Sequence, residues 1–302
     1  MFIKIIQFIA VLLLSPLLFG IISRTKAFFA GRRGAPLLQL YYDLFKLFQK
    51  GAVYSTTTTW VFVAGPIIGL GAALAALTLV PFAGHPALFA FNGDLILFIY
   101  LLALARFFAV IAALDTGSSF EGMGASREIQ FAAFAEPALF LSLAALARVT
   151  ESLSLSSIFS HLAARPSAMA EPALFLIIGA LLIVFLAENS RIPVDDPNTH
   201  LELTMIHEVM ALDHGGVDLG YILYAAVIKF WVLGTLIAGI FFPGHWQGRP
   251  EGCVVFVLGM AALAFVVGIV ESVLARLRLV KVPHFLIVSL ALSILALAFT
   301  MR

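Results

Sequence analysis

Residues 171–208 decide how this chain folds, and they read EPALFLIIGALLIVFLAENSRIPVDDPNTHLELTMIHE. The first part, up to Ala187, is a nearly unbroken apolar run about as long as a helix that crosses a membrane. The rest, from Glu188 to Glu208, is a polar island, although only 12% of the whole chain is charged. Such a cluster is costly beside a bilayer unless protein or water surrounds it. We therefore look for function there first.

Composition places the whole chain in the membrane. Hydrophobic residues make up 62% of its 302 residues, against about half in soluble domains. The net charge of +1 and the absence of a basic run longer than Arg32-Arg33 give no sign of a nucleic-acid partner. The single cysteine, Cys253, excludes an internal disulfide and any cysteine-ligated iron–sulfur or zinc site within this chain.

We expect an all-α polytopic membrane protein, with residues 1–302 forming a single integral membrane domain of about eight transmembrane helices. The first apolar segment lacks a small-x-small cleavage pattern and is predicted to be a span rather than a removable signal. The predicted spans are 3–23, 60–81, 94–114, 128–148, 171–189, 218–242, 253–274 and 282–300.

Basic residues predict the orientation of these spans, because short cytoplasmic loops are enriched in Lys and Arg. Most of the 18 Lys and Arg residues lie in the loops 24–59, 115–127, 190–217 and 275–281. These loops, and with them the polar island, should face the cytoplasm. Both termini should then be periplasmic.

The first of these loops contains an amphipathic segment, 36–50. Its polar residues Gln39, Asp43, Lys46 and Lys50 recur every three to four positions, so they form one stripe on an otherwise apolar helix. The segment is predicted to lie in the membrane surface or to pack under a partner or beside a substrate cavity. Ser55 and the four threonines that follow it can cap the next span, which begins at Trp60.

Ionisable residues inside or near the spans form a second set of candidates. They are Arg106, Glu128, Glu136, Lys229 and Glu271. Each costs at least a few kcal/mol at the membrane centre unless it is paired or hydrated. For Arg106 we favour a buried pair that holds helices in register. For Glu136 and Lys229 we favour proton exchange, because desolvation brings it nearer to neutral pH. Glu271 is expected at the cytoplasmic interface.

The island itself contains ordinary structural signals beside its functional candidates. Thr199-x-x-Glu202 has the form of a helix capping box, so Glu202 can be a cap as well as a proton-exchanging group. Asp195-Asp196-Pro197 is typical of a turn. His200 and His207 share a helix face, but the second histidine of the zinc-protease motif is missing, so we expect no metal site. No catalytic or cofactor-binding motif is present in the chain.

Three regions together resemble the H subunit of respiratory complex I and, more closely, its relatives in membrane-bound group 4 nickel–iron hydrogenases such as formate hydrogenlyase. The first is Gly31-Arg-Arg-Gly-Ala-Pro-Leu-Leu-Gln39, which leads into Tyr41-Tyr-Asp-Leu-Phe-Lys46. The second is Gly124-Ala-Ser-Arg127 with Glu136 downstream, and the third is the island. The first loop is shorter than in quinone enzymes, and Lys229 stands where a carboxylate is expected in complex I.

This resemblance implies a non-catalytic subunit of an oxidoreductase complex in the bacterial inner membrane, with no cofactor of its own. The implied partners are hydrogenase-like large and small subunits and a ferredoxin-like subunit, which carry the nickel–iron site and iron–sulfur clusters. Antiporter-like membrane subunits and lipid complete the list. Coupling to proton or sodium translocation would rest on Glu136, Glu188, Asp195, Glu202, Glu208 and Lys229, with Arg106, Glu128, Arg191 and His207 as secondary candidates.

Three alternatives stay open at this point. The chain could be the quinone-site subunit of a complex-I-type enzyme, with the amphipathic helix and the cytoplasmic loops walling a quinone cavity. It could be a passive membrane anchor in which the intramembrane charges only pair with their neighbours. A stand-alone ion transporter is less compatible with a polar cluster on one side only.

Overall fold

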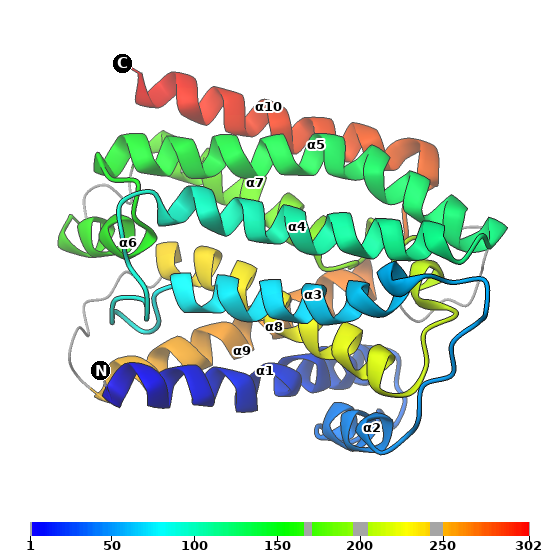
Figure 1. Ribbon diagram of the computed structural model, residues 1–302. Coiled ribbons are helices and arrows are strands. Elements are labelled where there is room, and N and C mark those ends of the chain that lie inside the picture. The colour runs from blue at the N-terminus through cyan, green and yellow to red at the C-terminus, as the bar shows by residue number, and fades with distance from the viewer. Residues whose placement is uncertain (1, 166–170, 196–204, 242–249, 302) are drawn as a thin grey trace.

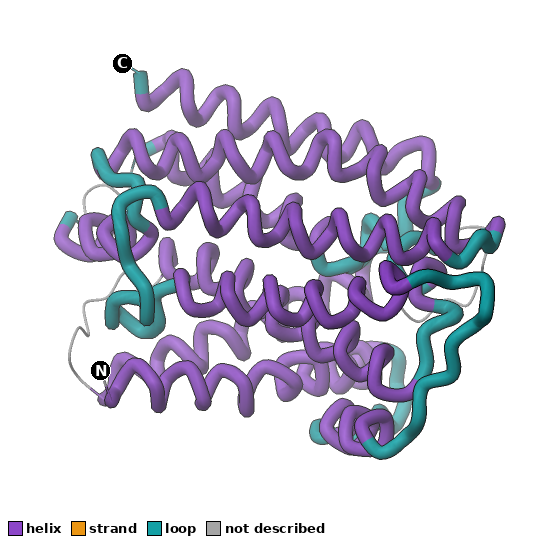
Figure 2. The backbone as a smooth tube through the Cα atoms, in the orientation of Figure 1, coloured by secondary structure: helices purple, strands orange, loops and turns teal. Residues whose placement is uncertain are grey.

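The computed structural model describes residues 2–165, 171–195, 205–241 and 250–301. These residues form helices joined by loops, with no strand among them (Figure 2). The α-helices are α1 (Phe2–Phe29), α2 (Gln39–Phe48), α3 (Trp60–Leu79), α4 (Asp94–Asp115), α5 (Ser119–Thr150), α6 (Leu155–Ala164), α7 (Pro172–Glu188), α8 (Gly216–Phe241), α9 (Pro250–Val273) and α10 (Val282–Thr300). Two short 3-10 helices, Val209–Ala211 and Leu279–Lys281, lie in the loops.

The long helices run back and forth in one bundle, with both ends of the chain at the same end and α2 near the opposite end (Figure 1). Within the described part, seven helices are long and apolar enough to cross a membrane. The remaining predicted span, 171–189, corresponds to α7, which has 17 residues. That length is at the lower limit for a crossing, so this crossing stays a prediction. The fold class is confirmed.

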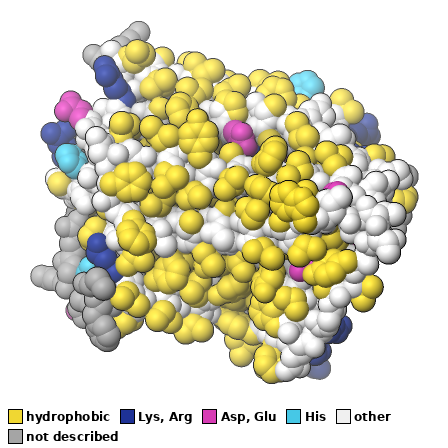
Figure 3. All heavy atoms as spheres, in the orientation of Figure 1, with side chains coloured by type: hydrophobic (Ala, Val, Ile, Leu, Met, Phe, Trp, Pro, Cys, Tyr) yellow, Lys and Arg dark blue, Asp and Glu magenta, His cyan; other side chains and the backbone are white. Residues whose placement is uncertain are grey.

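The surface of the bundle is that of a membrane protein. Hydrophobic side chains cover the face shown in Figure 3, while most of the Lys and Arg side chains visible there lie toward the two ends. Large apolar side chains such as Phe107, Phe140 and Phe175 are exposed, because lipid rather than water is their expected neighbour.

Three bounds differ from the prediction. α1 continues through Lys26 to Phe29 instead of ending at 23, because the Lys26 charge is paired with Glu271 at 2.9 Å. α5 begins at Ser119 rather than 128. Its polar first turns are buried against the loop that precedes α8, where Gly124 packs against Ile206 and Val209. The short helix α6 was not predicted; at 10 residues it is shorter than any span.

α6 is held by a buried carboxylate at the start of α4. Asp94 is fully buried, and it accepts hydrogen bonds from the Ser154 hydroxyl at 2.8 Å and the Leu155 backbone N–H at 2.7 Å. Leu155 is the first residue of α6, so Asp94 satisfies a backbone donor that the helix itself leaves unpaired. At the opposite end of the bundle, Thr59 caps α3 as predicted, accepting from the Val61 N–H at 3.2 Å.

Pro16 breaks the hydrogen-bond ladder of α1, and two tyrosines repair it. A proline has no N–H to donate to the carbonyl four residues earlier, which here is that of Leu12. The hydroxyl of Tyr224 on α8 donates to the Leu12 carbonyl at 3.0 Å, and that of Tyr41 on α2 donates to the Leu13 carbonyl. The break in α1 is thus an attachment point for both α2 and α8.

The predicted amphipathic helix is confirmed as α2, which packs against α1 and α8. Leu44 is its buried residue, and Gln39 bonds Asp43 across one turn at 2.9 Å. Two glycines permit the close approach. A Cβ at Gly20 would overlap the Leu37 carbonyl just before α2, and one at Gly220 would lie 2.8 Å from the Phe48 ring.

Replacing Tyr224 with Phe should destabilise the bundle. The change leaves the Leu12 carbonyl without a donor inside an apolar environment, which costs about 1–3 kcal/mol. We expect the thermal unfolding midpoint of the purified protein in detergent to fall by a few degrees. The control is Tyr100→Phe on α4, where the side chain is largely exposed. An equal change in both variants would contradict this role for Tyr224.

Candidate functional site

Arg106 on α4 is the centre of a charged network inside the bundle. Its Nε donates to Glu128 Oε1 on α5 at 2.9 Å, and its two terminal nitrogens bond Glu136 on α5 and Glu188 at the end of α7. The guanidinium group offers donors in several directions of one plane, so a single side chain joins three helices. The sequence suggested one buried ion pair for Arg106; the structure shows three.

Further charges balance these carboxylates. Lys229 on α8 pairs with Glu188 at 2.8 Å. The Nε2 atom of His207 lies 3.1 Å from Glu128, and its Nδ1 lies 3.6 Å from Asp195. Arg276, after α9, pairs with Asp195 at 2.9 Å. With His207 protonated, the four carboxylates of the network face four positive charges among the described residues. Buried charges need such pairing, because removing one partner costs several kcal/mol.

Asp195 also fixes the polypeptide that carries His207. Its Oδ2 accepts the backbone N–H groups of Ile206 at 3.2 Å and His207 at 3.3 Å. Asp195 is almost fully buried. The end of α7 and the segment before α8 are therefore joined directly, although nine residues between them lie outside the described part.

The loop position of His207 gives it a perturbed pKa. Burial opposes the charge of the ring, but the carboxylates of Glu128 and Asp195 outweigh it and raise the pKa of His207 to about 9. Burial likewise opposes the charge of Asp195, while hydrogen bonding to His207 and the charges of His207 and Arg276 hold its pKa below the ordinary value. Both groups are charged at neutral pH.

A second charged cluster joins α1, α9 and the segment after α7. Glu271 on α9 pairs with Lys26 of α1 at 2.9 Å and with Arg191 at 3.4 Å. The Arg191 guanidinium also lies 4.1 Å from the ring centre of Phe19. The side chain of Glu271 is fully buried, so the expectation that it sits at the membrane interface was wrong. Its two cationic partners explain why burial is tolerated.

A cavity of about 220 Å³ lies beside the Arg106 network. One wall consists of small residues on α3 and α4, among them Gly65, Gly69, Ala105, Ala109 and Ala112. The other wall carries Arg106, Glu128, Glu188, His207, His214 and Lys229. The absence of large side chains on α3 and α4 leaves space that borders the charged groups.

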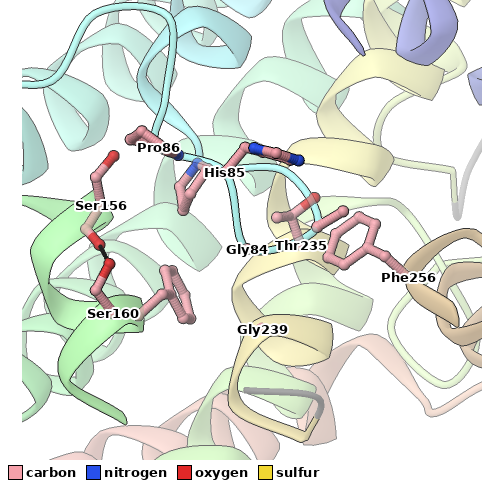
Figure 4. A pocket seen from close by; sticks show the side chains of 11 residues that line it. Gly84, His85, Pro86, Ser156, Ser160, Thr235, Gly239 and Phe256 are labelled. Atoms are coloured by element: carbon pink, nitrogen blue, oxygen red, sulfur yellow. Dashed lines mark hydrogen bonds between the residues drawn. The ribbon is translucent and has the colours of Figure 1, made fainter. Parts of the chain in front are cut away.

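A second, smaller cavity of about 30 Å³ lies at the other end of the bundle, beside α6 (Figure 4). Its hydroxyls already donate to the backbone: Ser160 bonds the Ser156 carbonyl at 2.8 Å and Thr235 bonds the Trp231 carbonyl at 2.9 Å. It has room for about one water.

The structure thus brings together seven of the predicted residues: Arg106, Glu128, Glu136, Glu188, Asp195, His207 and Lys229. Arg191 belongs to the second cluster, and Glu208 is half-buried directly after His207. Glu202, together with His200, Asp196 and the Thr199 capping box, lies outside the described residues. No group of three or more His, Cys, Asp and Glu side chains is placed to hold a metal ion in the described part.

Sequence reasoning missed four buried ionisable residues near helix ends: Asp94, Glu121, His214 and Asp218. All four lie outside or at the edge of the predicted spans, where a charged residue normally faces water. Their only sequence signal was a place beside a glycine or a helix start. Burial by neighbouring segments could not be seen from it.

The charge on His207 predicts a pH-dependent stability. A pKa raised by folding stabilises the protein fully below the ordinary value of about 6.5, and this contribution is lost as the pH rises through about 9. The unfolding midpoint should therefore fall between pH 7 and pH 10, by several degrees less in His207→Gln than in the native protein. The control is His161→Gln on α6, which is exposed. A pH dependence that is unchanged in His207→Gln would contradict the assignment.

Comparison with known proteins agrees with this arrangement. The profile of the NADH dehydrogenase family matches residues 3–301. Formate hydrogenlyase subunit 4 of Escherichia coli is 31% identical, over 92% of either chain, and hydrogenase-4 component C of the same organism is 32% identical, over 97% of this chain and 93% of its own. A membrane protein of the NADH-quinone oxidoreductase of Syntrophotalea carbinolica is 25% identical over 80% of this chain and 74% of its own.

A solved structure shares the fold. A chain of the membrane-bound sulfane sulfur reductase, an archaeal respiratory membrane complex, superposes with a TM-score of 0.82 at 21% identity and covers 97% of this chain and 98% of its own. The family profile covers nearly every residue, and the two hydrogenase-complex relatives exceed 30% identity along almost the entire length. This multi-pass membrane protein therefore belongs to the NADH dehydrogenase family.

Proposed function

We propose that this chain is the ion-coupling membrane subunit of a group 4 nickel–iron hydrogenase complex of the formate hydrogenlyase type. In this complex, redox chemistry in a cytoplasmic arm drives proton or sodium movement through the membrane part. The similarity to subunits named for formate hydrogenlyase and hydrogenase-4 supports this assignment. The carrying observation is the continuous chain of ion pairs from Asp195 through His207, Glu128 and Arg106 to Glu136.

The two ends of this chain of ion pairs have different surroundings. Asp195 and His207 lie in the island, which we place at the cytoplasmic junction with the arm. Glu136 lies midway along α5, and its side chain is 39% exposed. Acidic side chains are visible within the hydrophobic face of Figure 3. A carboxylate in that position calls for a polar neighbour in the assembled complex, and we propose that an antiporter-like subunit supplies it.

Arg106 transmits charge without releasing a proton, because a guanidinium group stays protonated in proteins. When His207 loses its proton, Glu128 loses one positive neighbour and attracts Arg106 more strongly. Glu136 and Glu188 then feel less of the guanidinium charge, which favours their protonation. A unit charge 4 Å away contributes about 4 kcal/mol near a protein surface, equivalent to about three pKa units. That is enough to move a proton onto or off a carboxylate.

The orientation follows from this assignment. The island faces the cytoplasm, both termini are periplasmic, and the membrane is the bacterial inner membrane. Partner subunits hold the nickel–iron site and the iron–sulfur clusters. The quinone alternative has less support, because the large cavity is walled by α3, α4, α8 and the segment before α8 rather than by α2.

Neutralising the network should uncouple the complex. In Glu136→Gln and Glu188→Gln, the number of ions moved per hydrogen formed should fall roughly tenfold, equivalent to about 1.4 kcal/mol. Hydrogen evolution with an artificial electron donor should persist, because no residue of the network touches a redox centre. The measurement is ion uptake by inverted membrane vesicles that contain the whole complex, beside hydrogen production in the same vesicles.

The matched control is Glu151→Gln, an exposed glutamate at the far end of α5. It should keep both activities. Full ion movement in both network variants would overturn the proposed function. Loss of the assembled complex in both, with normal coupling of whatever complex remains, would support the passive anchor instead.

A further inference from the structure

His214 stands between the charged network and the end of the bundle that we assign to the cytoplasm. It lies in the segment between the 3-10 helix Val209–Ala211 and α8, and its side chain lines the large cavity. Its ring stacks on Phe62 of α3, with centroids 3.9 Å apart and planes within 9°. Its backbone N–H donates to the Ala211 carbonyl at 3.2 Å. The imidazole is thereby fixed in place at one end of the cavity.

Buried polar atoms around this cavity lack protein partners. The Nδ1 atom of His214 and the Oδ1 atom of Asn189 are buried without a hydrogen-bond partner among the described residues, and both side chains line the cavity. Buried polar groups are nearly always hydrogen-bonded, if necessary to water. A cavity of about 220 Å³ has room for roughly seven waters at ~30 Å³ each. Water is therefore the natural occupant.

Acidic groups surround His214 on the side away from the cavity. Asp213 precedes it, and Asp218 lies in the first turn of α8; the negative charges of both act on the ring. Tyr54, before α3, hydrogen-bonds to Asp218. Glu121 at the start of α5 accepts the Asp213 N–H at 3.1 Å. Asp218 and Glu121 each keep one buried carboxylate oxygen without a partner among the described residues.

Across the cavity, His214 faces the network groups Arg106, Glu128, Glu188, His207 and Lys229. The two histidines differ in charge. Burial lowers the pKa of His214, against the opposing effect of Asp218 and Asp213, whereas His207 is held in its protonated form by two carboxylates at close range. A neutral imidazole has one nitrogen that accepts a proton and one that donates.

We propose that His214 is the proton-uptake residue of this cavity, passing protons from the acidic groups Asp213 and Asp218 to water that leads to Glu188, Lys229 and Glu128. One ring nitrogen takes a proton from a protonated carboxyl group, and the other releases its proton to a cavity water. One proton crosses per cycle, and a tautomer exchange restores the ring. The inference rests on the proposed coupling function and names the point where its protons arrive.

The first test asks whether the cavity holds water. In a Cys253→Ser background, Ala73→Cys places a thiol in the cavity wall, and Ala76→Cys on the same helix places one in the packed core. A small, charged, thiol-specific methanethiosulfonate reagent should modify the first and leave the second unmodified. This measurement requires no activity. Failure to modify Ala73→Cys would show a dry cavity and overturn the proposal.

The second test measures coupling in the whole complex. His214→Phe keeps an aromatic ring on Phe62 but cannot carry a proton, so protons moved per hydrogen formed should fall about tenfold, while hydrogen evolution persists. His214→Ala should fall similarly and regain coupling when imidazole is added. Imidazole should not rescue His214→Phe, because the ring space is filled. A residue that only supports the fold would give no such rescue.

Parallel assay of Glu188→Gln separates the two levels of inference. If Glu188→Gln uncouples and His214→Phe does not, His214 is not the uptake residue and the coupling function stands. If neither variant uncouples, the coupling function itself fails and the uptake role fails with it. Loss in both, with imidazole rescue of His214→Ala, supports the proposal.

Discussion

The positive charge of Arg106 is the constraint on which the rest of the interior depends. The side chain sits on α4, far from both ends of the helix, and only 9% of it is exposed. An unpaired charge there would cost several kcal/mol, so α5 and α7 must each bring carboxylates to it. Three carboxylates around one cation leave excess negative charge, and Lys229 on α8 and His207 before α8 supply what Arg106 cannot.

The polar island is not an exposed cytoplasmic loop in its described parts. Asp195 binds the backbone that carries His207, and Arg191 turns the other way, into a separate cluster with Glu271 and Lys26. One short segment therefore supplies charges to two interior sites. The first reaches the membrane-facing side of α5, and the second ties α1 to α9. This division explains how so dense a run of charge is accommodated within an apolar bundle.

Two histidines of the same region have opposite states because their neighbours differ. His207 lies against two carboxylates and is charged, while His214 lies on an aromatic ring beside a cavity and is neutral at the same pH. Sequence distance says nothing of this contrast, since both follow the island closely. A charged histidine responds to a change in its carboxylate partners, and a neutral one can exchange protons with water. The site therefore contains both an electrostatic sensor and a proton carrier.

The sequence alone determined that this is an all-α membrane protein, because long apolar runs can satisfy their backbone in lipid only as helices. It also determined the amphipathic helix, whose polar stripe follows the helical period, and the candidate charges, which stand out in an apolar chain. It could not determine which charges pair: Arg106 and Glu188 are 82 residues apart, and no local pattern encodes such a distance. Tertiary structure decided that Arg106 is the hub, that Glu271 is buried, and that small residues on α3 and α4 leave a cavity beside the network. It also decided the roles of Asp94, His214 and Asp218, because burial by distant segments, rather than residue type, gives those side chains their chemistry.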